Sequence, residues 1–186
     1  MSYPAVFLDR DGTINEEMGY INHPSRLVLL PQAAPAIRRL HEAGLKVVVV
    51  TNQSGAARGY FPVSLVAAVH RVMEDLLAQD AARLDGIYTC LHGPDDGCGC
   101  RKPQPGLILQ AARELDLDLG RSYLVGDRYV EMDTADRAGV KWILVLTGYG
   151  RGEWEHFAKA SRPQPAYVAR DLLDAAQWIV KDLEKP

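Results

Sequence analysis

Two carboxylates follow directly after an apolar segment near the start of the chain. Asp9 and Asp11 come after residues 6–8, and Gly12 follows them. The apolar residues predict a buried strand of a parallel sheet, and open α/β sheets place their ligands at the carboxyl ends of strands. Two carboxylates there can share a hard cation, and one of them can attack an electrophile. Taken alone, the motif also fits an acidic loop with a turn glycine.

A second polar motif follows the β-branched segment 46–50. Residues 51–55 read Thr-Asn-Gln-Ser-Gly. A hydroxyl, amides and successive backbone N–H groups in this position could hold phosphate oxygens. A turn rich in serine and asparagine is the simpler interpretation of this motif by itself.

Two more strand and helix boundaries carry charged residues. Arg101 and Lys102 precede a predicted helix, and Asp127 follows a predicted strand. A basic pair is common on surfaces, and Gly-Asp is a common turn. In a doubly wound sheet, however, these positions converge. We therefore expect Asp127 to complete a cation site with Asp9 and Asp11, and the two cations to face phosphate.

The cysteines form a second candidate site. Cys90, His92, Cys98 and Cys100 lie within eleven residues, and the intervening segment 93–97 is rich in turn residues. Three thiols and one imidazole can fill all four positions of a tetrahedral Zn²⁺, as structural zinc sites do. A redox thiol pair, or cysteines without a shared role, is the alternative.

Strand and helix patterns alternate along the whole chain. Strands are predicted over residues 6–8, 46–50, 86–89, 123–125, 142–146 and 167–168. Helices are predicted over residues 33–43, 62–82, 105–115, 130–138 and 172–183. Such alternation predicts an α/β fold, with a Rossmann-like, doubly wound parallel sheet flanked by helices. Residues 148–165 have no regular pattern, and we expect them to be mobile.

Length and composition indicate a single soluble domain spanning residues 1–186. The chain is 47% hydrophobic and 24% charged, and its formal net charge is −3. A nucleic-acid-binding protein would more often be basic. No apolar run approaches the roughly 20 residues of a membrane span. We expect a cytoplasmic protein that binds neither nucleic acid nor membrane, and a monomer.

The order of these motifs resembles that of the haloacid dehalogenase phosphatase superfamily. The resemblance covers residues 6 to about 148, and the segments that carry it are residues 9–13, 51–53, 102–103 and 126–127. It implies a phosphatase of that fold. The intervals between these motifs leave no room for a cap domain, so we expect a capless enzyme with an open pocket and a zinc-binding loop at 90–100.

Within the superfamily, the chain resembles the heptose bisphosphate phosphatases, a branch related to the histidinol-phosphate phosphatases. The resemblance rests on residues 14–15, 19–20, 51–59 and 100–103, and the same zinc loop occurs in these enzymes. It implies Mg²⁺-dependent removal of the C7 phosphate of D-glycero-D-manno-heptose 1,7-bisphosphate, a step toward ADP-heptose and lipopolysaccharide. The alternatives are a histidinol-phosphate phosphatase, another small phosphate monoester phosphatase, and a non-catalytic zinc-stapled binding module.

On this interpretation Asp9 is the nucleophile, and Asp11 protonates the leaving alkoxide and then activates water. Mg²⁺ is bound by Asp9, the backbone carbonyl of Asp11, and Asp127. Thr51 and Lys102 stabilise the transferring phosphoryl group. The substrate-binding residues implied are Glu17, Met18, Gly19, Tyr20, Asn52, Gln53, Ser54, Arg101 and Arg128.

Overall fold

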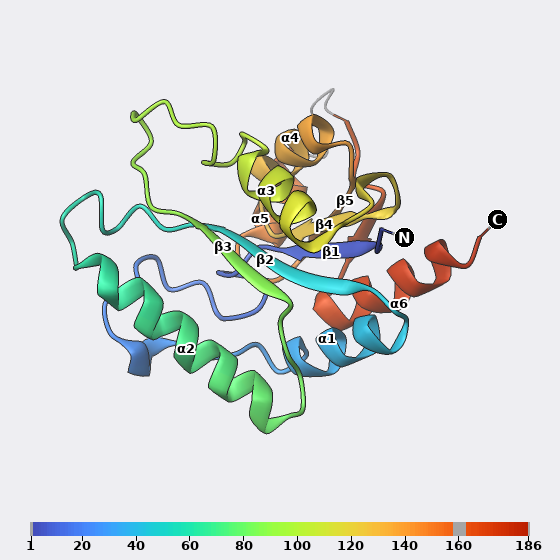
Figure 1. The fold of residues 1–186 in the computed structure, drawn as a ribbon, viewed down its shortest axis with the longest axis horizontal. Helices are drawn as coiled ribbons and strands as arrows, with labels where there is room; N and C mark the ends of the chain where they lie inside the picture. The colour runs from blue at the N-terminus through green and yellow to red at the C-terminus, as the bar shows by residue number, and fades with distance from the viewer. Residues whose placement is uncertain (1, 158–162, 186) are drawn as a thin grey trace.

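The fold is built on a six-stranded sheet in which all strands run parallel. The computed structural model describes residues 2–157 and 163–185. The strands lie in the order β3-β2-β1-β4-β5-β6 (Figure 1). Their bounds are β1 Ala5–Leu8, β2 Lys46–Asn52, β3 Gly86–Cys90, β4 Tyr123–Gly126, β5 Lys141–Val145 and β6 Tyr167–Ala169.

Helices cover both faces of the sheet, which confirms the doubly wound architecture (Figure 1). The helices α1, α2 and α6 pack on one face, and α3, α4 and α5 on the other. Their bounds are α1 Ala33–Glu42, α2 Val63–Gln79, α3 Gly106–Leu115, α4 Tyr129–Ala138, α5 Gly150–Phe157 and α6 Leu172–Leu183. Two 3₁₀ turns, η1 Pro24–Arg26 and η2 Leu119–Arg121, complete the described elements.

Strand β1 shows why both faces need a cover. Successive side chains of a strand point to opposite faces. Val6 and Leu8 therefore join the apolar cluster under α1, α2 and α6, while Ala5 and Phe7 join the cluster under α3 and α4. All four side chains are fully buried. The strand is thus apolar at every position until it ends.

The segment 148–165 differs from its prediction. Residues 150–157 form helix α5, and Trp154 packs against the apolar cluster on the α3 and α4 face. Residues 150–156 contain one large apolar side chain, that of Trp154, which explains why the sequence shows no clear period. Residues 163–165 form neither helix nor strand, and residues 158–162 of the segment expected to be mobile lie outside the described residues.

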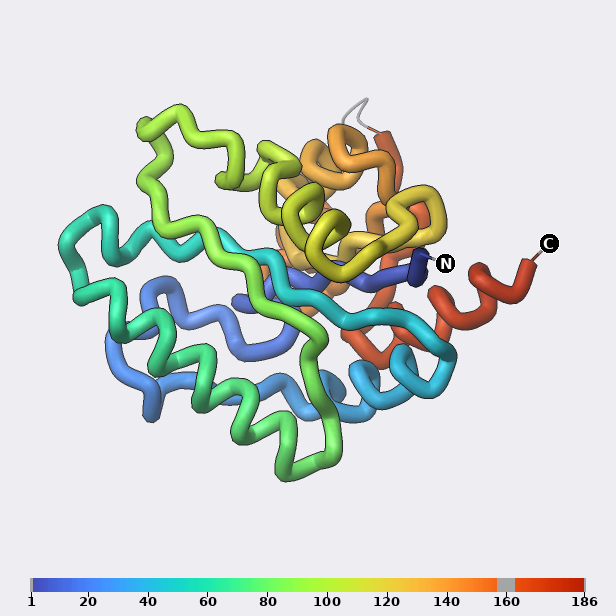
Figure 2. The backbone as a smooth tube through the Cα atoms, viewed as in Figure 1, coloured from blue at the N-terminus to red at the C-terminus, as the bar shows by residue number. Residues whose placement is uncertain are grey.

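The loops that follow the strands project from one end of the sheet. In Figure 2 the loop after β2 and the loop after β3 both extend to the left of the view. The described chain ends lie at the opposite end. The loops at the carboxyl ends of the strands can therefore form a binding site without interference from the chain ends.

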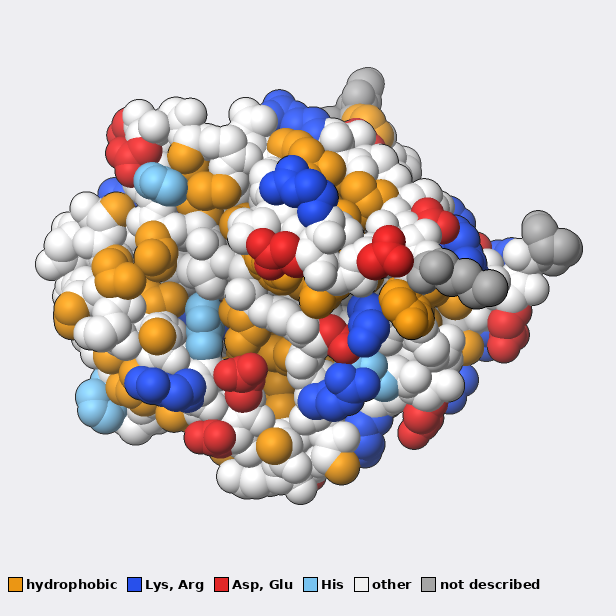
Figure 3. Space-filling model, viewed as in Figure 1, with side chains coloured by type: hydrophobic (Ala, Val, Ile, Leu, Met, Phe, Trp, Pro, Cys, Tyr) orange, Lys and Arg blue, Asp and Glu red, His pale blue; other side chains and the backbone are white. Residues whose placement is uncertain are grey.

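The surface carries both signs of charge. On the face shown in Figure 3, basic and acidic side chains are interspersed rather than gathered into one basic patch. Within residues 2–157 and 163–185, every helix falls short of the length and apolar character that a membrane crossing requires.

Candidate active site

A pocket of about 390 Å³ opens at the carboxyl end of the sheet. The ends of β1, β2 and β4 and the loop before α3 all contribute to it, as the sequence motifs predict. Its lining residues are Asp9, Asp11, Glu17, Gly19, Tyr20, Thr51, Asn52, Gln53, Ser54, Arg101, Lys102, Asp127, Arg128, Val130, Glu131 and Tyr149.

The floor of the pocket holds a buried lysine between two carboxylates. Lys102 Nζ lies 2.8 Å from Asp9 Oδ1 and 2.8 Å from Glu131 Oε1. Burial alone would lower the pKa of Lys102, but the charges of Asp9 and Glu131 outweigh burial and raise this pKa above its usual range. Lys102 is therefore a fixed cation beside the Asp9 carboxylate, suited to receiving the oxygens of a phosphoryl group.

Asp127 is packed against two glycines from different loops. Gly12 and Gly148 both have positive φ, 78° and 53°. A Cβ atom on either glycine would lie 2.1 Å from Asp127 Oδ2. Only glycine fits at both positions, because a side chain there would collide with the carboxylate and the backbone is left-handed.

The acidic cluster fits a divalent cation. Carboxylate oxygens of Asp9, Asp127 and Glu131 lie within 4.8 Å of one another. Asp127 Oδ2 accepts a hydrogen bond from the Tyr149 backbone N–H at 2.8 Å, but its buried Oδ1 has no partner. Burial and the nearby charge of Asp9 raise the pKa of Asp127 to about 8. A hard cation would relieve this accumulation of negative charge.

Asp11 is held from several directions. Arg10 donates to both oxygens of the Asp11 carboxylate, and Asn15 Nδ2 donates to Oδ1 at 2.9 Å. Gln53 Nε2 lies 2.8 Å from Asp11 Oδ2 and 2.9 Å from Thr51 Oγ1. The Asp11 side chain is nevertheless 15% exposed and lines the pocket.

Asn52 fixes the segment that carries Lys102. Its Nδ2 donates to the Lys102 carbonyl oxygen, and its Oδ1 accepts from the Lys102 backbone N–H, both at 3.1 Å. Strand β2 extends through Asn52, two residues beyond the predicted end. The side chains of Asn52 and Gln53 thus bond to protein groups, although both residues also line the pocket.

The rim of the pocket carries the cations and the aromatic rings. Arg128 lies over the Tyr149 ring, 5.0 Å from its centroid, and Tyr20 contacts Tyr60 edge to face. Glu17 accepts a hydrogen bond from the Gly19 backbone N–H, which fixes its loop. Of the predicted site residues outside the zinc set, Met18 alone is not part of the pocket lining.

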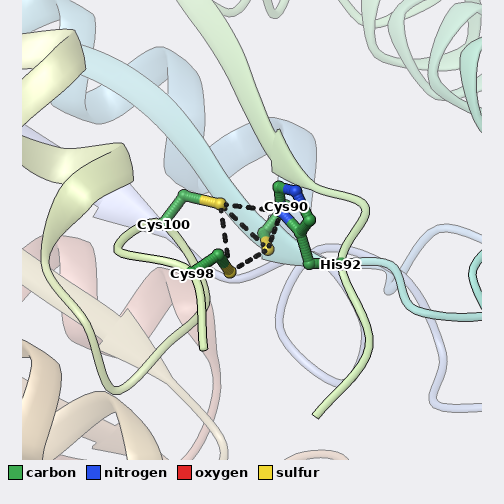
Figure 4. Close-up of side chains that lie close together, drawn as sticks. All are labelled: Cys90, His92, Cys98 and Cys100. Atoms are coloured by element: carbon green, nitrogen blue, oxygen red, sulfur yellow. Dashed lines mark hydrogen bonds between the residues drawn. The ribbon is translucent and has the colours of Figure 1, made fainter. Parts of the chain in front are cut away.

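The predicted zinc ligands converge on one point (Figure 4). The distances between the three sulfur atoms are 3.1, 3.5 and 3.7 Å, and His92 Nδ1 lies 3.3 Å from Cys100 Sγ. Zn–S bonds of about 2.3 Å in a tetrahedron place sulfurs roughly 3.7 Å apart. The four residues therefore fit a tetrahedral Zn²⁺. No disulfide joins the cysteines.

The cluster is directly connected to the pocket. Arg101 follows Cys100 in the chain, and its Nη1 donates to the His92 carbonyl oxygen at 3.2 Å. Burial raises the pKa of the Cys90 thiol to about 12, so this thiol favours a proton when no metal competes for it. Metal binding would convert the thiols to thiolates and hold the loop closed.

Glu131 is a site residue to which the sequence alone gave no role. It is 1% exposed, pairs with Lys102, and accepts from the Arg128 backbone N–H at 3.1 Å. Its position in the first turn of the helix after Asp127 is the signal that could have identified it. Asp133, two residues later, is not part of the pocket lining. Nothing in the sequence distinguishes Tyr149 as a pocket residue.

Comparisons with known proteins agree with this site. A family model for HAD-hydrolase-like proteins matches residues 99–175. A D-glycero-D-manno-heptose-1,7-bisphosphate 7-phosphatase of Thermosynechococcus vestitus is 42% identical, over 98% of both chains. A D-glycero-beta-D-manno-heptose-1,7-bisphosphate 7-phosphatase of Escherichia coli is also 42% identical, over 100% of this chain and 97% of its own.

A solved structure shows the same architecture. The D,D-heptose 1,7-bisphosphate phosphatase of Bordetella bronchiseptica, complexed with magnesium and phosphate, superposes with a TM-score of 0.88. It is 39% identical, and the match covers 96% of this chain and 99% of that one. The doubly wound sheet and the carboxylate–lysine pocket thus define a haloacid dehalogenase-like phosphatase. Within that class, the chain belongs to the D-glycero-D-manno-heptose-1,7-bisphosphate 7-phosphatase family.

Proposed function

We propose that this protein hydrolyses the C7 phosphate of D-glycero-D-manno-heptose 1,7-bisphosphate with Mg²⁺ and releases heptose 1-phosphate. The observation that carries the proposal is the meeting of Asp9, Asp127, Thr51 and Lys102 in one pocket. The end-to-end similarity to enzymes named for this substrate supports the choice of sugar.

The reaction proceeds in two steps. The first step begins with Asp9 ionised and Asp11 protonated. An Asp9 carboxylate oxygen attacks phosphorus, the bond from phosphorus to the C7 oxygen breaks, and Asp11 gives its proton to the departing alkoxide. In the second, Asp11 takes a proton from water, the water oxygen attacks phosphorus, and the bond to Asp9 breaks. Asp9 and Asp11 return to their starting states, and inorganic phosphate leaves.

The phosphoryl oxygens need compensation for their negative charge throughout. Lys102 supplies a buried cation, and Thr51 also lines the pocket, with its hydroxyl 2.9 Å from Gln53 Nε2. Asp9, Asp127 and the backbone carbonyl of Asp11 would hold Mg²⁺. When bound, this ion neutralises charge on the phosphate and aligns it with the nucleophile.

The second phosphate of the substrate requires its own cations. Arg101 and Arg128 are on the pocket lining, while Glu17, Gly19 and Tyr20 line it from the loop after β1. We assign the C1 phosphate to the arginines and the sugar hydroxyls to that loop. The open pocket is formed by loops, so specificity depends on these contacts. Zn²⁺ in the cluster at residues 90–100 has a structural role, because four protein ligands leave no open position.

The remaining proposals concern the setting of the enzyme. We place the protein in the cytoplasm as a single domain over residues 1–186. We also place its product on the route to ADP-heptose for lipopolysaccharide. Neither nucleic acid nor membrane is a partner in this proposal.

The deciding experiment compares phosphate release from two substrates in parallel. Heptose 1,7-bisphosphate and histidinol phosphate are each supplied with Mg²⁺, and kcat/KM is measured for both. A much higher value for the heptose bisphosphate supports the proposal. A preference for histidinol phosphate would retain the nucleophile and metal sites but replace the substrate.

A further inference from the structure

The Asp11 carboxylate is occupied by donors on both oxygens. Arg10 Nη2 lies 2.9 Å from Oδ1 and from Oδ2, and Arg10 Nε lies 3.2 Å from Oδ1. Asn15 adds a donor on Oδ1, and Gln53 adds one on Oδ2. These groups come from the loop after β1 and from the residue after β2. Donors on each oxygen leave the carboxylate one orientation.

Arg10 has the burial of a core residue. It is 1% exposed, and a buried guanidinium is costly unless it is paired and hydrogen-bonded. Burial, assisted by the charge of Arg10, lowers the pKa of the neighbouring His70 to about 4, so that imidazole is neutral at pH 7. Asp11 is the acidic residue that Arg10 contacts, with Arg10 Nη2 2.9 Å from Asp11 Oδ1.

Gln53 joins two parts of the site. Its Nε2 contacts Asp11 Oδ2 and Thr51 Oγ1, at 2.8 and 2.9 Å. The residue is 8% exposed, so the amide is mostly shielded from solvent. One buried amide thus sets the separation between the carboxylate and the hydroxyl.

We propose that Arg10 and Gln53 are positioning residues that aim the Asp11 carboxyl at the leaving oxygen of the phosphate ester. The proposal rests on the proposed function, which gives Asp11 its role in proton transfer. Arg10 and Gln53 act through Asp11. Their loss therefore affects the step that needs the Asp11 proton.

The leaving group distinguishes this role from general support of the fold. An alkoxide must receive the proton of Asp11 as its bond to phosphorus breaks. A p-nitrophenolate is stable as an anion and leaves without that proton. A misplaced Asp11 should therefore slow phosphorylation of Asp9 by an alkyl ester far more than by p-nitrophenyl phosphate.

The test measures the first step in Arg10→Met and Gln53→Met by rapid mixing of the Mg²⁺-loaded protein. The substrates are heptose 1,7-bisphosphate and p-nitrophenyl phosphate. We expect the rate with the sugar ester to fall about 10²-fold, and the p-nitrophenolate burst to change by about threefold or less. Arg10→Lys keeps the charge and should recover part of the loss. Gln110→Met, which removes an exposed Gln–Glu contact on α3, is the control expected to match wild type.

Equal losses on both substrates would overturn the proposal, since they indicate a structural role. If Arg10→Met does not fold, Gln53→Met decides the question. A crystal structure of Gln53→Met or Arg10→Lys adds a readout independent of activity, and an unmoved Asp11 carboxylate in both would also overturn the proposal. Wild-type protein that processes the aryl ester but not the sugar ester would contradict the proposed substrate alone. In that case glycerol phosphate replaces heptose 1,7-bisphosphate as the alkyl ester, and the variants are again compared on the alkyl ester and on p-nitrophenyl phosphate.

Discussion

At the scale of single residues, Asp9 combines exposure to the pocket with a fixed cationic neighbour. Its Oδ1 lies 2.8 Å from Lys102 Nζ. An amide at this position cannot form the acyl phosphate, so Asp9→Asn should lower phosphate release by at least about 10³-fold. Circular dichroism should show an intact fold. Asp133→Asn, a change outside the pocket lining, serves as the matched control. Turnover near wild type in Asp9→Asn would remove Asp9 as nucleophile.

The buried Asp127 carboxylate should destabilise the metal-free protein, because its position suits metal binding rather than folding. Its carboxylate is buried near Asp9, and one of its oxygens has no partner. Because ionisation at this site is unfavourable without a cation, Asp127→Asn should raise the Tm of the Mg²⁺-free protein by about 2–4 °C for each kcal/mol relieved. Added Mg²⁺ should raise the Tm of wild type but not of the variant. Thermal unfolding with and without Mg²⁺ checks both. An equal response of the two proteins to Mg²⁺ would exclude Asp127 as a ligand.

The residue types and their positions predicted most of the residues that line the site. They did not predict which side chains pair with one another inside it. Asp9, Thr51 and Asp127 lie at or near strand ends, which meet at one edge of a parallel sheet, and Lys102 lies in the loop before α3. The burial of Glu131 beside Lys102 depends on how the first turn of α4 packs. That packing is a tertiary property with no periodic signal in the sequence.

At the scale of elements, the loop of residues 90–100 brings together four side chains that fit a zinc ion. Its described contacts include those among the four ligands, that of Arg101 with the His92 carbonyl, and a hydrogen bond from the Gly106 backbone N–H to the Gly99 carbonyl. Metal analysis should therefore find about one zinc per chain. Cys98→Ser should lower the Tm and raise KM more than it lowers kcat, because Arg101 loses its support. Asp95→Asn, in the same loop, is the control. A Cys98→Ser protein with unchanged zinc content would contradict the ligand set.

The start of β3 is tied to β2 and α1 by Asp85. Burial alone would raise the pKa of Asp85. Hydrogen bonds from the Val47 backbone N–H, His41 and Lys46 outweigh this effect and lower the pKa from 3.8 to about 2. The unfolded chain therefore binds this proton first as the pH falls. The resulting stability is complete above pH 4 and is lost between about pH 4 and 2.

Asp85→Asn should accordingly destabilise the protein by about 1–3 kcal/mol at pH 7. The difference from wild type should shrink as the pH approaches 2. Urea unfolding at pH 7 and pH 3 measures both values, with Asp80→Asn as the control. A difference that does not depend on pH would show that the charge of Asp85 contributes nothing.

Periodicity predicted the elements with long apolar faces. Helix α6 spans Leu172–Leu183, the predicted range, and α1 ends one residue early. Helix α5 was missed because it has eight residues, and one large apolar side chain within residues 150–156 is too little pattern to detect. The order of the strands also lay beyond the sequence, since it depends on which way each crossover returns.

At the scale of the whole molecule, helices cover both faces of the described sheet. The apolar surface of the strands is thus satisfied within one chain. We expect a monomer of 20.5 kDa that unfolds in one cooperative transition. Sedimentation equilibrium and calorimetry test this. A stable dimer would require an interface on one of the edge strands or on the aromatic rim.

The contact of Gly12 and Gly148 with Asp127 has a consequence for how the sequence can vary. The three residues come from three separate loops, yet no side chain at either glycine fits while Asp127 is in place. In a saturation library selected for activity, both glycine codons should survive almost unchanged. Selected for folding alone, a shortened residue at 127 should relax the requirement at position 12 but not at position 148, where a Cβ would still lie 2.6 Å from the Gly12 Cα. The mutational tolerance of distant segments is thereby coupled through one carboxylate.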